Sequence, residues 1–236
     1  GLGAGEGNVI RNNVDDGVRI RGQSVSVLSN RIYGNGLMPV DLVGLPNGPD
    51  PNDGDDHDVG ANGLQNYPVI ESASLSGGNT LIQAHLRSLP NLTYKVQFYS
   101  ATTCHSSGLG EGNSLLGTVD ALTDVSGNAD LFYTGPSSSG TVTAIATDAT
   151  GSTSEFGNCV ALGPLSTGQF RLSNSIYYGY EDTGEMVVQV TRSSGTFGPA
   201  SVTLSTENIT ATAGLDYVTT TTTLNFATGE TTKVVR

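Results

Sequence analysis

The first 36 residues contain an internal repeat with a shift of 22 residues. Asn8-Val-Ile10-Arg-Asn-Asn13 is echoed by Asn30-Arg-Ile32-Tyr-Gly-Asn35, and between them Val18 and Ile20 alternate with arginines. A period in the twenties with strand-like alternation indicates a solenoid, in which each repeat forms one rung and stacks on the next. Repeated isoleucines would then line the interior, and repeated asparagines could form a hydrogen-bonded ladder at the corners.

This repeat resembles the right-handed parallel β-helix of bacterial surface proteins and polysaccharide-active enzymes. Residues 1–40 hold only one to two rungs, so we expect them to be the C-terminal end of a longer helix. Asp15 and Asp16 form an acid pair of the kind that inverting polysaccharide hydrolases use. The next rung offers neither a histidine nor an acid, and Asp-Gly is ordinary turn chemistry, so we expect no catalysis here.

Residues 41–66 form an acidic segment rich in Asn, Gly and Pro, which predicts a loop. Its six aspartates, with no Lys or Arg among them, are Asp41, Asp50, Asp53, Asp55, Asp56 and Asp58. Mutual repulsion between carboxylates favours capture of a cation. Asp53, Asp55 and Asp58 are the candidate Ca²⁺ ligands, although Leu64 stands where an EF-hand loop has its glutamate. A solvated loop without metal is the alternative.

Residues 67–162 contain short alternating segments separated by turn residues, with Ile82, Ala84 and Leu86 expected on one face. Six or seven strands at this spacing are typical of an immunoglobulin-like sandwich. The segment Asp148-Ala-Thr-Gly-Ser-Thr-Ser-Glu-Phe156 adds a resemblance to the Ig-like domain that caps bacterial β-helix proteins. Cys104 and Cys159 are the only cysteines. We expect a disulfide and an oxidising compartment, with two free buried thiols as the alternative.

After a predicted linker at 163–168, residues 169–236 resemble the Calx-beta domain. The resemblance rests on Glu207-Asn-Ile-Thr-Ala-Thr-Ala-Gly-Leu-Asp216-Tyr217 and on Gly229-Glu230. It implies a β-sandwich, here truncated, that holds Ca²⁺ between carboxylates of neighbouring loops. Glu181, Glu207 and Asp216 occupy matching acidic positions, whereas Asn208 replaces a usual aspartate and threonines follow Tyr217. In the alternative interpretation, these acids only order turns.

The composition narrows the class of function. The net charge of −12 argues against nucleic acid as a partner, because phosphate binding needs basic patches. No stretch is apolar enough for a membrane helix, no export signal opens the sequence, and His57, His85 and His105 match no zinc pattern. We expect an all-β, non-enzymatic fragment of an extracellular or cell-surface protein with a structural or adhesive role. Glycans or proteins are its candidate partners, and Ca²⁺ is a candidate ligand of its loops. The alternative is an accessory region of a carbohydrate-active β-helix enzyme.

Overall fold

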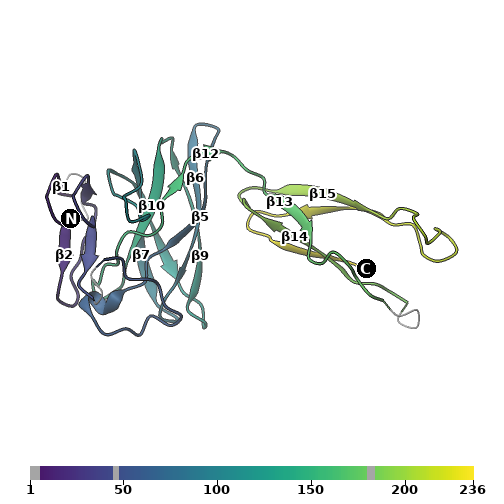
Figure 1. The fold of residues 1–236 in the computed structure, drawn as a ribbon, viewed down its shortest axis with the longest axis horizontal. Helices are drawn as coiled ribbons and strands as arrows, with labels where there is room; N and C mark the ends of the chain where they lie inside the picture. Colours follow the sequence, from purple (N-terminus) through teal and green to yellow (C-terminus); the bar gives the residue numbers. More distant parts are fainter. Residues whose placement is uncertain (1–5, 45–47, 180–183) are drawn as a thin grey trace. The chain divides into compact units, whose positions relative to one another are not determined.

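The computed structural model describes residues 6–44, 48–179 and 184–236. It confirms an all-β fold, and its only helix among these residues is the short 3-10 helix η1 (Ala61–Leu64). The chain divides into two compact units, Gly1–Leu165 and Ser166–Arg236, which we describe separately (Figure 1). None of the helical structure in the described residues is long and apolar enough to cross a membrane.

The 22-residue repeat appears as two short parallel strand pairs. β1 (Val9–Arg11) pairs with β3 (Arg31–Tyr33), and β2 (Val18–Ile20) pairs with β4 (Val40–Leu42). Every strand partner lies 22 residues away, as Val9 opposite Arg31 and Val18 opposite Val40 show. The predicted period is therefore confirmed, but two pairs of three-residue strands do not show a parallel β-helix, and that interpretation stays a prediction.

The expected asparagine ladder follows the same period. The backbone N–H and side-chain amide of Asn8 both donate to Oδ1 of Asn30, at 2.9 and 3.1 Å. Asn13 donates in the same two ways to Oδ1 of Asn35, at 3.2 and 2.8 Å. Asn35 is buried and Asn30 is half-buried, so their side-chain oxygens need these partners, while Ile32 fills the interior.

Asp41 corrects the boundary predicted between the repeat and the acidic loop. It lies in β4 rather than in the loop and is 1% exposed. Its carboxylate forms an ion pair with Arg19 of the paired strand β2, at 3.2 Å. The period already pointed there, since Asp41 follows Arg19 by 22 residues. The many Gly, Pro and Asp residues that follow Asp41 nevertheless favour a loop in the sequence, which is why the predicted loop begins too early.

The middle of the chain forms a sandwich of two four-stranded sheets, with strand orders β11-β10-β7-β8 and β12-β5-β6-β9. Ile82 and Leu86 from one sheet and Val96 and Phe98 from the other are fully buried between them, which confirms the predicted inward face. The strands are β5 (Val69–Ser76), β6 (Asn79–Arg87), β7 (Thr93–Ala101), β8 (Ser114–Leu122), β9 (Asn128–Pro136), β10 (Thr141–Thr147), β11 (Val160–Ala161) and β12 (Gly163–Pro164). That the sandwich is Ig-like stays a prediction.

The first residues of the predicted linker belong to the sandwich. Gly163 and Pro164 form β12 and pair in parallel with Ser74 and Leu75 of β5. The division between the two units then falls after Leu165. The glycine and proline that suggested a linker thus serve as a short edge strand, where a missing N–H costs little.

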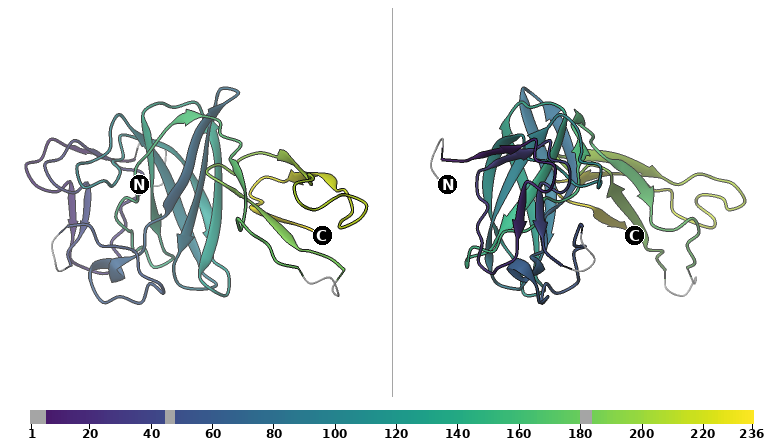
Figure 2. Two further views of the ribbon diagram at one scale, coloured as in Figure 1. Left: turned by 45° about the vertical axis from the view of Figure 1, so that its right-hand side comes forward. Right: turned by 60° about the vertical axis from the view of Figure 1, so that its left-hand side comes forward.

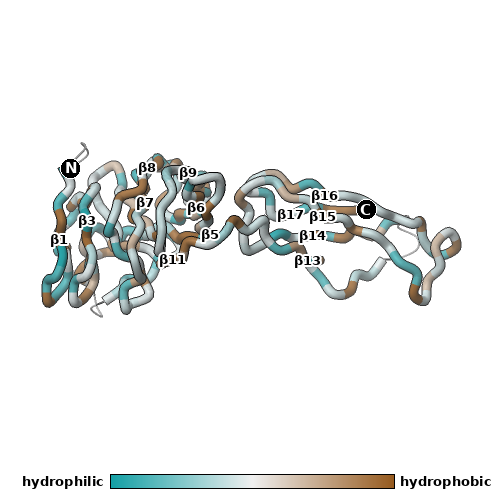
Figure 3. Tube along the Cα trace, turned by 90° about the horizontal axis from the view of Figure 1, so that it is seen from above, coloured by the Kyte–Doolittle hydropathy of each residue, from teal (hydrophilic) through white to brown (hydrophobic). Residues whose placement is uncertain are grey.

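The repeat segment packs on the outer face of the β7/β10 sheet and shares a core with it. Ile20, Ile32 and Leu42 lie in one apolar cluster with Tyr99, Ile145 and Phe156. β7 and β10 are therefore buried on both faces. Figure 3 shows a hydrophobic (brown) stretch at β7. A strand covered on both faces loses polar alternation, which explains the almost continuous apolar run Val142–Ala146. Figure 2 shows the repeat segment beside this sheet.

The second unit has a three-stranded sheet, in the order β13-β14-β17, and a two-stranded sheet of β15 and β16. Its core is small: Val190, Leu224 and Phe226 are buried, and Phe170 packs on Phe226 with ring centroids 5.2 Å apart. The strands are β13 (Gln169–Leu172), β14 (Val188–Ser193), β15 (Ala200–Ser205), β16 (Thr221–Phe226) and β17 (Thr232–Val235). The threonine run at 219–223 leads into β16, as β-branched residues favour.

Candidate functional site

The acidic loop is tied to the sandwich through one buried aspartate. Asp56 is 8% exposed, and its carboxylate accepts hydrogen bonds from the Asn66 N–H (2.9 Å), the Gln65 amide (2.7 Å) and the Ser88 hydroxyl. The Ser88 hydroxyl also lies 2.8 Å from that of Tyr94. Burial raises the pKa of Asp56. Its lone pairs are engaged in holding the loop, so Asp56 is a structural residue.

Asp53 closes the same turn from the other side. Its Oδ1 accepts from the Asp56 N–H at 2.6 Å, and its own N–H donates to Oδ1 of Asn66 at 3.0 Å. Asn52 adds a second tie, since its side chain donates to the Tyr67 carbonyl and accepts from the Tyr67 N–H. Asn52, Asp53 and Asp56 are therefore held in place by hydrogen bonds to one another or to the end of the same loop.

A cavity of about 290 Å³ opens between this loop and the turn after β10. Asp56, His57, Asp58 and Asp148 line it, whereas Asp53 and Asp55 do not. Both carboxylate oxygens of Asp148 accept hydrogen bonds from Thr150. Among the residues that the structure describes, no group of three or more His, Cys, Asp or Glu side chains is arranged to hold a metal ion. Ca²⁺ binding by Asp53, Asp55 and Asp58 stays a prediction.

In the second unit, the predicted calcium ligands are spread along the chain. Glu181 lies outside the described residues. Glu207 is exposed, and Oδ2 of Asp216 accepts from the N–H of Thr212, four residues earlier, at 2.8 Å. Asn208 is the organising residue, because its Oδ1 accepts both the Ala213 N–H (2.9 Å) and the Tyr217 hydroxyl. The sequence showed Asn208 only as a departure from the family pattern.

The two aspartates of the first repeat, Asp15 and Asp16, differ in their surroundings. Asp16 pairs with Arg19, and its Oδ1 accepts the Met38 N–H at 2.9 Å. Asp15 is exposed. Asp16 therefore holds one repeat onto the next, which agrees with the expectation that this pair serves structure.

Two polar side chains join the repeat segment to the sandwich. Asn62, 3% exposed, accepts from the Val25 N–H and donates to the carbonyls of Val25 (2.8 Å) and Thr153 (2.9 Å). Glu155, 1% exposed, accepts the N–H groups of Leu42 and Asp50, both at 3.1 Å. Sequence reasoning missed Glu155, and the one available signal was its position between Ser154 and Phe156 in an otherwise uncharged segment.

Burial raises the pKa of Glu155 to about 8, and the negative charges of Asp50 and Asp41 add to the effect. The pKa of Asp41 and that of Asp50 are also raised, in both cases mainly by burial. The folded state therefore holds a proton on Glu155 at pH values where the unfolded chain, with an ordinary value of 4.5, has released it. Stability from this group is complete below about 4.5 and is lost as the pH rises toward 8.

Glu155→Gln should remove most of this pH dependence. Glutamine is uncharged like the protonated acid, but its amide nitrogen cannot accept one of the two backbone N–H groups, so at pH 5 the variant should be less stable by about 1 kcal/mol. At pH 8 the variant should be the more stable, because no buried charge has to form. Urea unfolding followed by circular dichroism at both pH values measures this, with the exposed Glu71→Gln as a control. A parent protein that gains stability from pH 5 to pH 8 relative to the variant would contradict the assignment.

The predicted disulfide is present. Cys104, in the loop after β7, is bonded to Cys159, with Cα atoms 5.6 Å apart. The Gly110 N–H donates to the Gly157 carbonyl at 2.9 Å, so the same two segments also meet through the backbone. The loop then contacts the repeat segment, where the Ile32 N–H donates to the Gly112 carbonyl at 2.8 Å.

Comparison with known families identifies the second unit. Residues 166–236 match the Calx-beta domain family. The predicted Calx-beta region, 169–236, is thereby confirmed, with its start three residues earlier. No curated protein matches the chain.

Two solved structures show a weak likeness. The crystal structure of CBD12 from CALX1.2 is 17% identical, with 71% of this chain and 72% of that chain covered and a TM-score of 0.33. That of the calcium binding domain CBD12 of CALX1.1 is 16% identical, with 71% and 73% covered and a TM-score of 0.32. Neither likeness is strong enough to carry an argument, so the Calx-beta assignment rests on the family match.

Proposed function

We propose that this chain is part of a non-enzymatic, modular extracellular or cell-surface protein with a structural or adhesive role. In this proposal, the end of a parallel β-helix is fused to an Ig-like sandwich and followed by a Calx-beta domain. One observation carries it: the repeat segment and the sandwich share an apolar core that includes Ile32, Leu42, Tyr99 and Phe156. Modules joined by a shared core transmit force as one body, which suits a stalk or an adhesin.

The disulfide supports placement outside the cytoplasm, because such bonds persist in oxidising compartments. The test is to treat intact producing cells with protease and to follow the full-length protein by immunoblot. We expect the protein to be cut while a cytoplasmic marker is spared. Complete protection in intact cells, followed by cleavage after lysis, would refute a surface location.

Calcium is proposed as a ligand of the loops, with support from the Calx-beta match. The proposed ligands are Glu181, Glu207 and Asp216 in that domain, and Asp53, Asp55 and Asp58 in the acidic loop. Terbium luminescence and calorimetry should give saturable binding, which Asp53→Asn combined with Asp58→Asn would weaken at the loop and Glu207→Gln at the domain. Absence of saturable binding up to millimolar Ca²⁺ would remove calcium from the proposal.

Asn208→Asp should strengthen calcium binding in the Calx-beta domain. A carboxylate oxygen can still accept from Ala213 N–H and the Tyr217 hydroxyl, and it adds a charge beside Glu207 and Asp216. Because affinity rises with the number of charged ligands, we expect Kd to fall about tenfold. Asn225→Asp makes the same charge change on the exposed side of β16 and should leave Kd unchanged. An equal fall in Kd for the two substitutions would mean that Ca²⁺ responds to the total charge of the protein and not to a site at Asn208.

An accessory region of a carbohydrate-active β-helix enzyme is the second candidate. The parallel strand pairs with 22-residue register favour it as much as they favour a stalk. The two candidates differ in the rungs of the complete protein. Catalytic rungs would carry clustered acids together with histidine or basic partners, and the full coding sequence would show them.

A further inference from the structure

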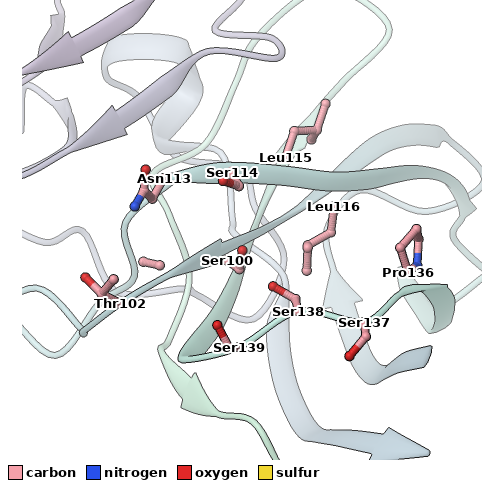
Figure 4. Close-up of a pocket in the computed structure, with 11 residues that line it drawn as sticks. Ser100, Thr102, Asn113, Ser114, Leu115, Leu116, Pro136, Ser137, Ser138 and Ser139 are labelled. Carbon is pink, nitrogen blue, oxygen red and sulfur yellow. The ribbon is translucent and has the colours of Figure 1, made fainter. Parts of the chain in front are cut away.

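A groove of about 380 Å³ lies at one end of the sandwich, in the first unit. Its walls come from the end of β7, the start of β8 and the turn that follows β9 (Figure 4). The volume is within the range of small-ligand sites. No sequence motif marks this groove, because its residues come from three separate segments.

The groove has one polar wall and one apolar wall. Hydroxyl groups come from Ser100 and Thr102 at the end of β7, from Ser114 and from the triple serine at 137–139. Leu115 and Leu116 of β8 and Pro136 supply apolar surface, and Leu115 is 39% exposed. None of the lining residues is Asp, Glu, Lys, Arg or His.

The backbone around the groove is fixed while the hydroxyls are free. The Ser137 N–H donates to the Gly78 carbonyl at 3.1 Å, the Ser138 N–H to the Thr80 hydroxyl at 2.8 Å, and the Asn113 N–H to the Ser100 carbonyl at 3.0 Å. The hydroxyls of Ser100, Ser138 and Ser139 have no hydrogen-bond partner among the described residues. Donors and acceptors held in place and left unpaired are preorganised for a ligand.

Ser100 is the one buried residue among the serines and the threonine that line the groove. It is only 7% exposed, yet its hydroxyl lines the groove without a partner in the described part of the chain. The hydroxyl oxygen itself is open to the solvent in the groove, so it is accessible to a ligand there. Ser138 and Ser139 lie around the same space, so a ligand there would meet several hydroxyls at once (Figure 4).

The absence of charge in this lining decides the class of ligand. Phosphate, sulfate and carboxylate groups are recognised by cationic side chains, and Ca²⁺ by carboxylates. A sugar ring instead offers hydroxyls at its edge and C–H groups on its face, which match the serine wall and the leucine wall. We propose that the serine-lined groove binds a neutral saccharide. This proposal rests on the adhesive role proposed above and gives it a class of ligand.

The test uses the 236-residue protein on an array of neutral, sialylated and sulfated oligosaccharides, followed by NMR titration of the strongest neutral binder. We expect binding to neutral glycans, with chemical-shift changes at Ser100, Leu116 and Ser138. Ser100→Ala should weaken binding about fivefold, the equivalent of one neutral hydrogen bond of about 1 kcal/mol. Ser126→Ala, at a turn outside the groove, should not change the affinity.

Ser100→Ala should also leave the unfolding midpoint unchanged, because the hydroxyl that it removes makes no hydrogen bond within the described part of the chain. A lower affinity is then not the result of unfolding. Four results would each overturn the proposal. They are no binding of neutral glycans, binding of charged glycans alone, occupation of the groove by a peptide that pairs with the edge of β8, and an affinity that Ser100→Ala does not change. The protease experiment on intact cells is independent, so a failed glycan assay with a surface-exposed protein would leave the structural role standing.

Discussion

Arg192→Ala should unfold the Calx-beta domain selectively. Arg192 is 2% exposed, and its guanidinium donates to the carbonyls of Thr167 (2.9 Å), Ala227 (3.1 Å) and Gly198 (2.8 Å). Alanine would leave three carbonyls without their partner, at about 1 kcal/mol each, or about 3 kcal/mol in total. A unit of this size has little stability to spare, and among its described residues the core cluster holds three buried apolar side chains.

Hydrogen exchange followed by mass spectrometry would measure this effect in each unit of the whole chain. Amides of β14 and β16 should lose protection in the variant, while those of β7 and β10 keep theirs. Arg192→Lys should be intermediate, because lysine keeps the charge but lacks the planar set of donors. Arg171→Ala, on the exposed side of β13, is the matched control. Equal protection in the alanine variant and the parent would show that this arginine is dispensable.

The second large effect is expected from the disulfide. Replacing both Cys104 and Cys159 with serine should lower the unfolding free energy of the first unit by about 4 kcal/mol, given their separation of 55 residues. The loop that contains Cys104 also contacts the repeat segment through Gly112, so part of that contact should loosen as well. Urea unfolding monitored by circular dichroism gives the first quantity.

Reduction of the parent protein with dithiothreitol provides the matching comparison. It should reproduce the double-serine variant without changing any side chain other than the two cysteines. Hydrogen exchange at Ile32, which donates to Gly112, reports on the repeat segment. A loss of less than about 1 kcal/mol in both experiments would mean that the unfolded chain gains little freedom from opening this loop.

Local patterns in the sequence predicted most of the fold. Alternation placed Ile82, Ala84 and Leu86 in the core, and the 22-residue period placed Val9 opposite Arg31. The predictions failed where a residue's role depends on a distant contact. Asp41 was assigned to a loop because Gly and Pro follow it, although Arg19 holds it in a strand. Gly163 and Pro164 were assigned to a linker, although β5 pairs with them.

The candidate sites were harder to predict for the same reason. Carboxylates close together in the sequence suggest a calcium site, yet Oδ1 of Asp53 and Oδ1 of Asp56 each accept a backbone N–H of the same loop. Glu155 and Arg192 acquire their roles only from burial between segments far apart in the chain. The serine-lined groove is assembled from two strand ends and one turn that are separate in the sequence, and a single serine in such a place carries no signal of its own.

The asparagine ladder has a direction, and this limits how the protein can change in length. In each pair the earlier asparagine donates and the later one accepts, through the oxygen of Asn30 or Asn35. Asn8 and Asn13 use their N–H groups in these bonds, so their side-chain oxygens could accept from the asparagines of another repeat of the same kind. The same donor and acceptor arrangement recurs after any whole number of repeats. Insertions or deletions in this segment are compatible with the fold in steps of 22 residues, so duplication of complete repeats is the natural route by which such a protein grows longer.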